Sequence, residues 1–477
     1  GKYDVPVYYR MKFDGQTPKQ NHFSVDVTLN DVGLYFYYFD LYTDFRRIVR
    51  GPDNCGVVSW QDGEKWQITV YEADFETPAP IKGKVFYQIF PDRFCEGIEN
   101  KPMPFPDRLY QADKHAEPFW QPNETGGHLN EDYFGGDLEG IRIKLPYLRE
   151  MGVDYLYLNP IFEAHSNHRY NTADYLNVDP LLGTNEEFEV LCREAAKYGI
   201  GIVLDGVFSH TGSDSRYFNR EGRYGDGGAY RDPNSPYRSW YDFDPKYKGG
   251  YRSWWGFETL PEVNEENPSY VEFITGEGGV IDTWLRRGAA GFRLDVADEL
   301  PDDVLRDMRA AAKAADPDSV LLGEVWEDGS NKIAYSQRRR YLLGRQVHGL
   351  MNYPFRTALL NWLAGGDAAV FRDSMETIRE NYPPFAFYGA MNFLGTHDTA
   401  RILTLLGAEG TPKTKAERAA YRLSPTELAR GLAKLRLAGM LLYSFPGSPT
   451  LFYGDEAGVQ GFEDPLNRGA FPWGSED

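Results

Sequence analysis

Two carboxylates lie where two predicted buried strands end. Asp295 closes the apolar run 291–295, and Glu324 lies near the end of the run 319–326. Core strands normally avoid such residues, and neighbouring strands of a parallel barrel bring their ends together. Hydrolysis of a glycosidic bond with retention of configuration needs two carboxyl groups roughly 5–5.5 Å apart. We therefore expect Asp295 to be a nucleophile and Glu324 a general acid/base.

Three further polar side chains complete this predicted site. Arg293 lies two residues before Asp295, so both point to the same face of a strand, where the cation keeps the nucleophile ionised. Glu324 must hold its proton near neutral pH, so we expect it to have drier surroundings. Asp398 and His397 end another predicted strand. There they are expected to hold sugar hydroxyls and to stabilise an oxocarbenium-like transition state.

Short apolar runs that end in polar residues must position these side chains. They alternate with helix-like segments such as 182–198, 301–315 and 425–443. Strands that alternate with helices predict an α/β fold, a (β/α)8 TIM barrel whose chemistry collects at the C-terminal strand ends. The eight predicted strands are 83–91, 152–160, 201–210, 291–295, 319–326, 349–355, 390–398 and 448–456.

The chain divides into three predicted parts. Residues 83–210 and 270–477 form the barrel, and 211–269 form an inserted subdomain after its third strand, because so long a polar and aromatic loop is usually functional. Residues 1–82 read as an N-terminal β-sandwich. About 20 residues follow the eighth strand, and they show neither a clear eighth helix nor a C-terminal β domain, so either the chain is truncated or the barrel closes in another way. The predicted N-terminal strands are 3–12, 23–29, 33–40 and 66–71.

Four motifs resemble the signature regions of the α-amylase superfamily, glycoside hydrolase family 13. Their order and their places on the third, fourth, fifth and seventh strands match that family. A further segment, 158–175, resembles the second-strand region, and the likeness covers about residues 84–473. The resemblance implies a retaining α-glucan hydrolase. The four motifs are DGVFSH (205–210), GFRLDVADE (291–299), GEVW (323–326) and FLGTHD (393–398).

The same resemblance implies roles for other residues. His168 and Tyr170 would contact the sugar at the cleavage subsite, and His210 would contact its hydroxyls. Asp205 would support the site structurally. Arg293 and His397 would also face the substrate.

Two segments are similar to the neopullulanase and cyclomaltodextrinase group. LPEVN (260–264) resembles a signature of that group, and 453–473 resembles its eighth-strand loop, in which Asp464 and Arg468 would line the non-reducing-end subsites. The N-terminal domain of that group can shape the cleft of a partner subunit, so the resemblance implies a homodimer through this domain. The acidic Asp298-Glu299 differs from the usual Asn-Glu of the group.

The resemblance also implies a structural calcium site after the first barrel strand, although no cofactor is required for the chemistry. Oxygen ligands suit calcium. Ile98 stands where a ligand is often found, and Ser209 replaces the amide ligand of a second family calcium site. The candidate ligands of the first site are Glu96, Asn100, Gly135 and Asp137.

Composition excludes several other classes of protein. A net charge of −20 provides no basic footprint for nucleic acid. No run of about 18 apolar residues is present, so no membrane span is expected. Three scattered cysteines without CxxC spacing predict neither a disulfide framework nor a zinc site. No signal peptide is visible, which favours a cytoplasmic location; secretion stays open because the sequence begins at Gly1 rather than Met.

Several functions remain open on this evidence. The first is hydrolysis of α-1,4 links in maltooligosaccharides, cyclodextrins, pullulan or starch, with transglycosylation as a variant. An α-glucosidase, an oligo-1,6-glucosidase or an endo-acting α-amylase is the alternative among enzymes. A catalytically inactive carbohydrate-binding homologue is the alternative of another class, and the retained acids Asp295 and Glu324 argue against it.

Overall fold

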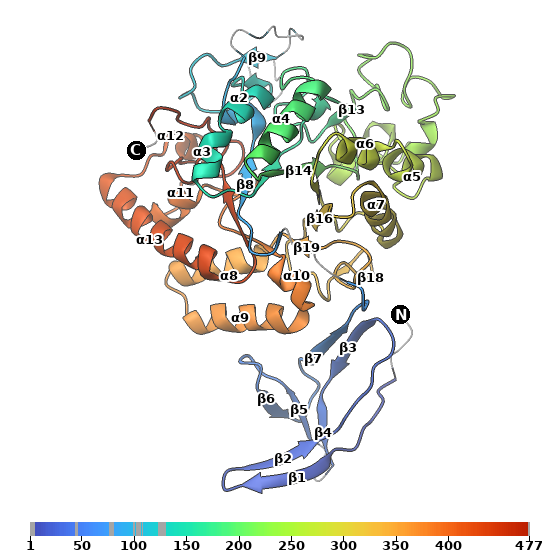
Figure 1. Cartoon of the computed structure of the whole chain (residues 1–477), viewed down its shortest axis with the longest axis vertical. Coiled ribbons are helices and arrows are strands. Elements are labelled where there is room, and N and C mark those ends of the chain that lie inside the picture. Colours follow the sequence, from blue (N-terminus) through green and yellow to red (C-terminus); the bar gives the residue numbers. More distant parts are fainter. Residues whose placement is uncertain are drawn as a thin grey trace.

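A closed barrel of parallel strands forms the centre of the molecule (Figure 1). The computed structural model describes residues 5–42, 46–75, 81–98, 101, 106, 108–122 and 130–475. Eight strands pair in the order β19-β16-β15-β14-β11-β8-β21-β20, and a parallel bridge between Met351 and Met391 joins the two ends of this sheet. The predicted (β/α)8 fold is confirmed. The strands are β8 (Phe86–Ile89), β11 (Tyr155–Leu158), β14 (Gly201–Gly206), β15 (Gly291–Leu294), β16 (Val320–Gly323), β19 (Gly349–Leu350), β20 (Met391–Phe393) and β21 (Ser448–Phe452).

Helices surround this barrel, and several begin at sequence signals of the expected kind. At the start of α4, Thr184 and Glu187 form a capping box, and Ser424 and Glu427 do the same for α13. The three helices predicted from the sequence correspond to α4, α7 and α13. The helices are α1 (Pro91–Phe94), α2 (Leu138–Ile143), α3 (Leu145–Glu150), α4 (Asn185–Lys197), α5 (Pro268–Thr275), α6 (Val280–Arg286), α7 (Asp302–Ala315), α8 (Tyr353–Leu363), α9 (Ala368–Asn381), α10 (Pro384–Tyr388), α11 (Ile402–Gly407), α12 (Lys415–Ala420) and α13 (Pro425–Ser444).

Alternation along each strand separates two hydrophobic cores. Along β14, Ile202 and Leu204 belong to the large core between sheet and helices, whereas Val203 belongs to the small core inside the barrel. Successive side chains of a strand point to opposite faces. Asp205 therefore shares the inward face with Val203, and the inward face becomes polar at the C-terminal end of the strand.

The N-terminal region is rich in strands but has little core of its own. It contains three small antiparallel sheets, β1–β2, β3–β7 and β4–β5–β6. The predicted strand 23–29 is wrong beyond Ser24, and the predicted strand 3–12 is wrong over residues 5–11, since β1 begins at Lys12; its residues 3 and 4 lie outside the described residues. The strands are β1 (Lys12–Thr17), β2 (Gln20–Ser24), β3 (Gly33–Tyr37), β4 (Phe39–Leu41), β5 (Arg46–Arg50), β6 (Gly56–Ser59) and β7 (Trp66–Val70).

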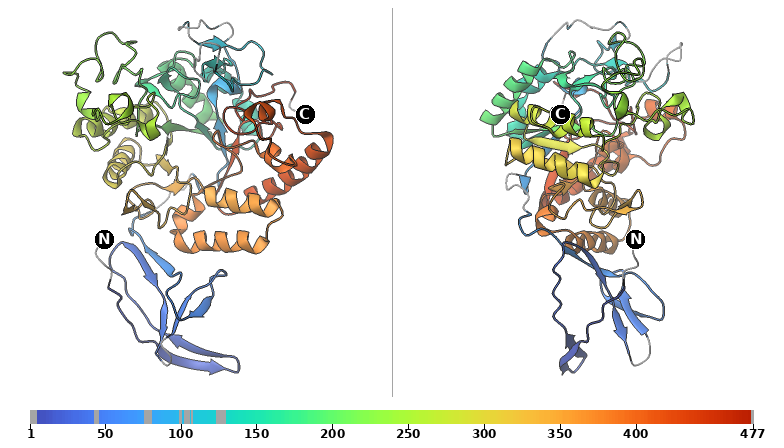
Figure 2. Two further views of the ribbon diagram at one scale, coloured as in Figure 1. Left: turned by 180° about the vertical axis from the view of Figure 1, so that it is seen from behind. Right: turned by 90° about the vertical axis from the view of Figure 1, so that its right-hand side faces the viewer.

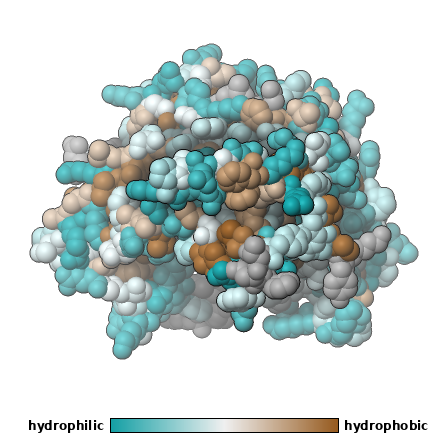
Figure 3. Space-filling view, turned by 90° about the horizontal axis from the view of Figure 1, so that it is seen from below, coloured by the Kyte–Doolittle hydropathy of each residue, from teal (hydrophilic) through white to brown (hydrophobic). Residues whose placement is uncertain are grey.

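The solvent exposure of the apolar side chains explains why these two strands are shorter than predicted. The apolar residues at alternate positions, Phe23, Val25 and Val27, are 54%, 38% and 42% exposed, so no packed layer holds this stretch in a sheet. Figure 3 views the molecule from this end and shows apolar patches among polar ones. The region projects away from the barrel (Figure 2). It is attached by contacts of β7 and the following residues, such as the Glu72 amide donating to the Leu343 carbonyl at 2.9 Å.

Two additions stand at the C-terminal side of the barrel. A hairpin of β12 (Phe162–Ala164) and β13 (Thr172–Val178) follows β11. Between β14 and α5, the chain runs through turns that include short 3-10 helices at Arg238–Trp240, Lys248–Gly250 and Trp254–Gly256. The remaining short strands are β9 (Leu109–Tyr110), β10 (Asp132–Tyr133), β17 (Ile333–Ala334) and β18 (Gln337–Arg338).

Two further features concern the cysteines and the possibility of a membrane span. Cys55, Cys95 and Cys192 are all unpaired. Among the described residues, no helix combines the length and the apolar character that crossing a membrane requires.

Candidate active site

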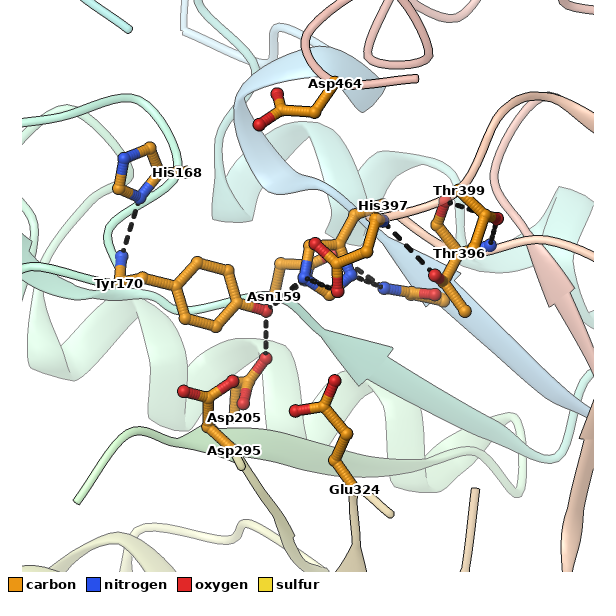
Figure 4. Close-up of polar contacts among 12 residues, drawn as sticks. Asn159, His168, Tyr170, Asp205, Asp295, Glu324, Thr396, His397, Thr399 and Asp464 are labelled. Atoms are coloured by element: carbon orange, nitrogen blue, oxygen red, sulfur yellow. Dashed lines mark hydrogen bonds and ion pairs between the residues drawn. The ribbon is translucent and has the colours of Figure 1, made fainter. Parts of the chain in front are cut away.

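Three adjacent strands carry the polar residues of the site to one end of the barrel. Asp205 lies in β14, Arg293 lies in β15, and Asp295 and Glu324 directly follow β15 and β16. The register places Asp205 beside Arg293. Inward alternation continues past the strand ends, so all four side chains point into the mouth of the barrel, where Figure 4 shows the three acids together.

A single buried guanidinium joins the three acids. Arg293 Nη1 lies 2.8 Å from Asp205 Oδ1 and 2.8 Å from Asp295 Oδ1, and its Nη2 lies 2.8 Å from Glu324 Oε2. Arg293 is fully buried. Burial works against its charge, but Asp205 and Glu324 outweigh that effect and hold the pKa of Arg293 well above its usual value. The guanidinium therefore stays charged and fixes the spacing of the acids.

The charge state of Asp295 depends on opposing effects. Burial raises its pKa, Arg293 opposes the rise, and the carboxylates of Glu324 and Asp205 add to it. Acids that interact so closely titrate as a group rather than one by one. The exposed fractions of Asp295 and Glu324 are 6% and 5%, so the expected difference in dryness between nucleophile and acid is not present. Hydrogen bonding, rather than burial, distinguishes the two side chains.

Glu324 receives two hydrogen bonds that Asp295 does not share. The Val296 amide donates to its Oε2 at 2.9 Å, and the Trp326 indole N–H donates to its Oε1 at 3.0 Å. Val296 has φ of 40°, a left-handed conformation that is strained for a β-branched residue. The Trp326 ring stacks on Tyr353 with centroids 4.1 Å apart. Both donors hold the carboxyl group in one orientation.

Tyr170 and His397 form a flat aromatic wall on the other side of the acids. Their rings are nearly parallel, with centroids 5.2 Å apart, and the Tyr170 hydroxyl lies 2.6 Å from His397 Nε2. The same hydroxyl donates to Asp205 Oδ2 at 2.7 Å, and Tyr157 donates to that oxygen at 2.7 Å. Asp205 thus has contacts with Arg293 and two tyrosines, which fits its predicted supporting role. Figure 4 shows the hydrogen bond from Tyr170.

Gln88 sets the tautomer of His397. Its amide nitrogen donates to Asn159 Oδ1 at 3.0 Å and lies 2.8 Å from His397 Nδ1. If the amide donates to Nδ1, the ring proton must be on Nε2, which faces Tyr170. Burial, together with Arg468 and Arg293, keeps the pKa of His397 well below its usual value. His397 is therefore a neutral hydrogen-bond donor.

Asp398, Arg468 and Asp464 line the more open part of the site. Arg468 lies 2.9 Å from Asp464 Oδ1 and 3.6 Å from Asp398 Oδ1. The Arg468 Nε donates to the His397 carbonyl at 3.0 Å, which ties the loop after β21 to the loop after β20. The side chains of Asp398 and Asp464 are 33% and 50% exposed. These two carboxylates are accessible to a ligand that enters the mouth.

His168 and His210 are neutral imidazoles; His210 is buried and His168 is partly buried. Burial lowers the pKa of His168 to about 3 and that of His210 to about 4. His168 Nδ1 accepts from the Tyr170 amide at 3.1 Å. His210 Nδ1 lies 3.1 Å from Ser209 Oγ, whereas its Nε2 is buried with no hydrogen-bond partner among the described residues. A buried polar nitrogen without a partner marks a place where a ligand hydroxyl can bind.

The remaining predicted residues form a separate group. Glu96, Gly135 and Asp137 lie at the loops around α1 and α2, and Asn100 lies outside the described residues. Within the described part of the chain, no cluster of three or more His, Cys, Asp or Glu side chains suits a metal.

Sequence reasoning did not select five residues that shape the site. Gln88 is a polar residue inside an apolar run and Asn159 lies at the end of one, a signal that could have been read. Trp326 stands inside the GEVW motif. Two others gave no signal, because the strained conformation of Val296 and the inward hydroxyl of Tyr157 depend on the fold. These residues are Gln88, Tyr157, Asn159, Val296 and Trp326.

Comparison with known proteins identifies a family and several similar chains. The family model described as the catalytic domain of alpha amylase matches residues 88–472. The amylopullulanase of Thermoanaerobacterium saccharolyticum is 36% identical over 513 residues, covering 97% of this chain. Neopullulanase 2 of Thermoactinomyces vulgaris is 34% identical over 408 residues, covering 84% of this chain.

The chain is shorter than these relatives. It spans 39% of the amylopullulanase and 60% of the neopullulanase. Among solved structures, the cyclic α-maltosyl-(1→6)-maltose hydrolase of Arthrobacter globiformis superimposes with a TM-score of 0.67 and 30% identity. That match covers 84% of this chain and 80% of the other.

Proposed function

Because the chain belongs to the α-amylase catalytic-domain family, glycoside hydrolase family 13, we propose that it hydrolyses α-1,4-glucosidic bonds of α-glucans with retention of configuration. One observation carries the proposal. A buried Arg293 guanidinium contacts both Asp295 and Glu324 at 2.8 Å, at the ends of adjacent barrel strands. That arrangement suits the roughly 5–5.5 Å spacing that a retaining glycosidase needs.

The reaction follows from the positions of the two acids. An Asp295 oxygen attacks the anomeric carbon while the bond to the leaving oxygen breaks, and Glu324 gives its proton to that oxygen. A glycosyl ester on Asp295 results. Glu324, now a carboxylate, takes a proton from water, the water oxygen attacks the same carbon, and Asp295 leaves as a carboxylate. Two inversions give net retention.

The surrounding residues bind the reacting sugar. The flat Tyr170–His397 pair offers a surface for the apolar face of a sugar ring, and the unpartnered Nε2 of neutral His210 is available for a hydrogen bond to a sugar hydroxyl. Asp398 lies beside His397, with its Oδ2 3.2 Å from His397 Nε2. Its negative charge stabilises the positive charge that develops on the ring in the transition state.

The substrate class rests on the relatives and on the loop after β14. Residues 260–264, LPEVN, approach the site, since Glu262 forms a β-bridge with His210 and the Val263 amide donates to the Ser209 carbonyl at 3.1 Å. Relatives named neopullulanase and cyclomaltodextrinase support maltooligosaccharides, cyclodextrins, pullulan or starch as substrates.

A relative named amylopullulanase and a similar structure named cyclic α-maltosyl-(1→6)-maltose hydrolase favour testing α-1,6 bonds as a second candidate. An inactive carbohydrate-binding homologue is disfavoured. The two acids, their shared Arg293 and the orienting donors to Glu324 are all retained in working positions. A binding protein has no need of them.

Azide rescue of two alanine variants tests the assignment. In Glu324→Ala, an activated aryl α-glucoside still forms the glycosyl ester on Asp295, and azide should attack it to give an α-glycosyl azide. In Asp295→Ala, azide should attack the substrate directly and give the β-glycosyl azide. The opposite configurations, or rescue of neither variant, would overturn the roles.

Glu327→Ala serves as the matched control, because this acid lies three residues after Glu324 but its side chain is 66% exposed. It should hydrolyse at the wild-type rate and give no azide adduct. Products from pullulan, β-cyclodextrin, soluble starch and isomaltose, compared side by side, then define the bond that is cleaved.

A further inference from the structure

Lys101 follows α1 and contacts two other segments of the chain, the turn before α2 and the turn before α4. Its ammonium group donates to the Gly135 carbonyl at 2.9 Å and to the Leu181 carbonyl at 3.1 Å. It also forms an ion pair with Asp137 Oδ2. The Lys101 side chain is 12% exposed, and that of Asp137 is fully buried. An ammonium group has three donors, and each finds one oxygen here.

The Asp137 carboxylate has little capacity for a further cation. Its Oδ1 accepts from the Gly97 amide at 3.0 Å and from the Gly140 amide at 2.6 Å, and its Oδ2 accepts from the Ile98 amide at 3.0 Å. These bonds cap α2 and hold the loop after α1. With Lys101 they use the roughly four acceptor sites of a carboxylate.

Glu96, the other acid of the expected calcium site, is also engaged by a lysine. Its oxygens accept from the Tyr110 hydroxyl at 2.8 and 2.9 Å, and Lys114 Nζ lies 3.0 Å from Oε2. Ile98 offers no side-chain oxygen to a cation. Calcium takes six to eight oxygen ligands, roughly, and a divalent ion beside the buried Lys101 ammonium would be repelled. The described residues do not fit calcium.

We propose that the Lys101 ammonium replaces a structural calcium ion in this chain. It binds the kinds of oxygen that calcium would bind, namely two backbone carbonyls and one carboxylate. The single charge of lysine needs fewer ligands than a divalent ion does. Because this cation is covalently attached to the chain, neither dilution nor a chelator can remove it.

The position of Lys101 connects this cluster to the proposed active site, although the inference does not depend on the proposed activity. Asp132 lies three residues before Gly135, and its Oδ1 accepts a hydrogen bond from Asn167 Nδ2 at 2.9 Å. Asn167 precedes His168. The tethered cation therefore stabilises the loops that support the His168 segment, and its loss would loosen them.

Thermal unfolding of the intact chain tests the inference. The melting temperature should be the same within about a degree in EGTA, in millimolar Ca²⁺ and in millimolar Mg²⁺. Equilibrium dialysis against calcium should show no binding at this site. Lys101→Met keeps the apolar stem and removes the charge, so it should lower the melting temperature by several degrees, and calcium should not restore it.

Two further variants sharpen the test. Lys84→Met is the matched control, because the Lys84 side chain is 46% exposed and forms an ion pair with Asp154. The melting temperature of this variant should stay near that of the wild type. Lys101→Asp supplies an oxygen in place of the ammonium and should acquire calcium-dependent stability. The proposal would be overturned if the wild type bound one equivalent of calcium and its melting temperature rose with Ca²⁺ and fell in EGTA. This outcome can be read from the wild type alone, even if no variant folds.

Discussion

The Trp326 indole N–H donates to Glu324 Oε1 at 3.0 Å while the same ring stacks on Tyr353. The Val296 amide holds the second oxygen of Glu324 at 2.9 Å. The proposed general acid is therefore oriented from both sides, and one of its donors belongs to a side chain that can be replaced without changing the aromatic stack.

Trp326→Phe should slow the reaction without unfolding the protein. Phenylalanine preserves the stack on Tyr353 but removes the hydrogen bond to Glu324, which is worth about 1.5 kcal/mol. We expect kcat to fall roughly tenfold or more, with the basic limb of the pH–rate profile displaced. Steady-state kinetics across the pH range provide the measurement.

Trp473→Phe provides the comparison, since its indole donates to the Phe94 carbonyl away from the acids. It should leave the pH–rate profile in place. A Trp326→Phe enzyme with an unchanged profile and unchanged kcat would show that the indole contact does not position Glu324.

The acid limb of kcat/KM should lie at a higher pH than an ordinary aspartate would give. Burial raises the pKa of Asp295, and the reaction needs Asp295 ionised. As the pH falls through the raised pKa, the carboxyl takes up its proton and activity is lost. The limb should therefore lie above about pH 3.9, the usual aspartyl value. A limb at or below that pH would contradict the proposed charge balance.

Asp295→Asn should abolish turnover and leave stability intact. An acid whose pKa is raised on folding destabilises the folded protein when it is ionised, and this cost is present above the folded pKa. At pH 7 the neutral amide removes that cost. We expect kcat to fall by several orders of magnitude, with an unchanged or slightly higher melting temperature by calorimetry. Activity above about a tenth of wild type would exclude Asp295 as the nucleophile.

His210 should make the folded protein sensitive to acid. Its pKa is about 4 when folded, against about 6.5 when unfolded, so below pH 6.5 the unfolded chain binds a proton that the folded chain does not. Stability is lost as the pH falls from about 6.5 to 4, by about 3 kcal/mol. His210→Gln should flatten the dependence of melting temperature on pH in this range.

The comparison of slopes isolates His210 from the buried acids, which titrate in both proteins. His115→Gln, at an exposed histidine, is the control and should keep the wild-type slope. Equal slopes in wild type and His210→Gln would mean that the pKa of His210 is not lowered on folding.

The sequence predicted the barrel and its acids because both depend on local patterns. Asp295 and Glu324 end apolar runs, and alternation alone points Arg293 to the same face as Asp295. The contact of Lys101 with Gly135 and Leu181 joins segments that only the fold brings together. No period or motif in the sequence could indicate it.

The N-terminal region was predicted less well for a related reason. Its alternating apolar residues suggested two packed sheets, yet Phe23, Val57 and Trp60 are 54%, 48% and 73% exposed. Alternation shows which side chains share a face, but it does not show whether another layer covers that face. The extent of each strand therefore depends on packing that the local sequence does not encode.

The last prediction concerns the size of the preferred substrate. We expect β-cyclodextrin and short maltooligosaccharides to be cleaved with a higher kcat/KM, per bond, than soluble starch. LPEVN beside His210 and the relatives named cyclomaltodextrinase motivate this expectation. Remote subsites contribute binding energy only where a polymer can reach them. A narrow entrance to Asp295 and Glu324 should therefore lower kcat/KM more for long glucan chains than for small substrates.

The N-terminal region lies close to the loop that follows Glu324. The Gln67 side chain contacts Asn331 at 2.8 Å and Ser330 at 3.2 Å. A polar pocket of about 410 Å³ lies beside these contacts, between the N-terminal region and the barrel. A homodimer through this region would narrow the cleft further. The test combines kcat/KM for β-cyclodextrin and starch with the solution mass from light scattering. A monomer that prefers starch and does not cleave β-cyclodextrin would reject this preference, whereas the azide experiment would still decide the roles of Asp295 and Glu324.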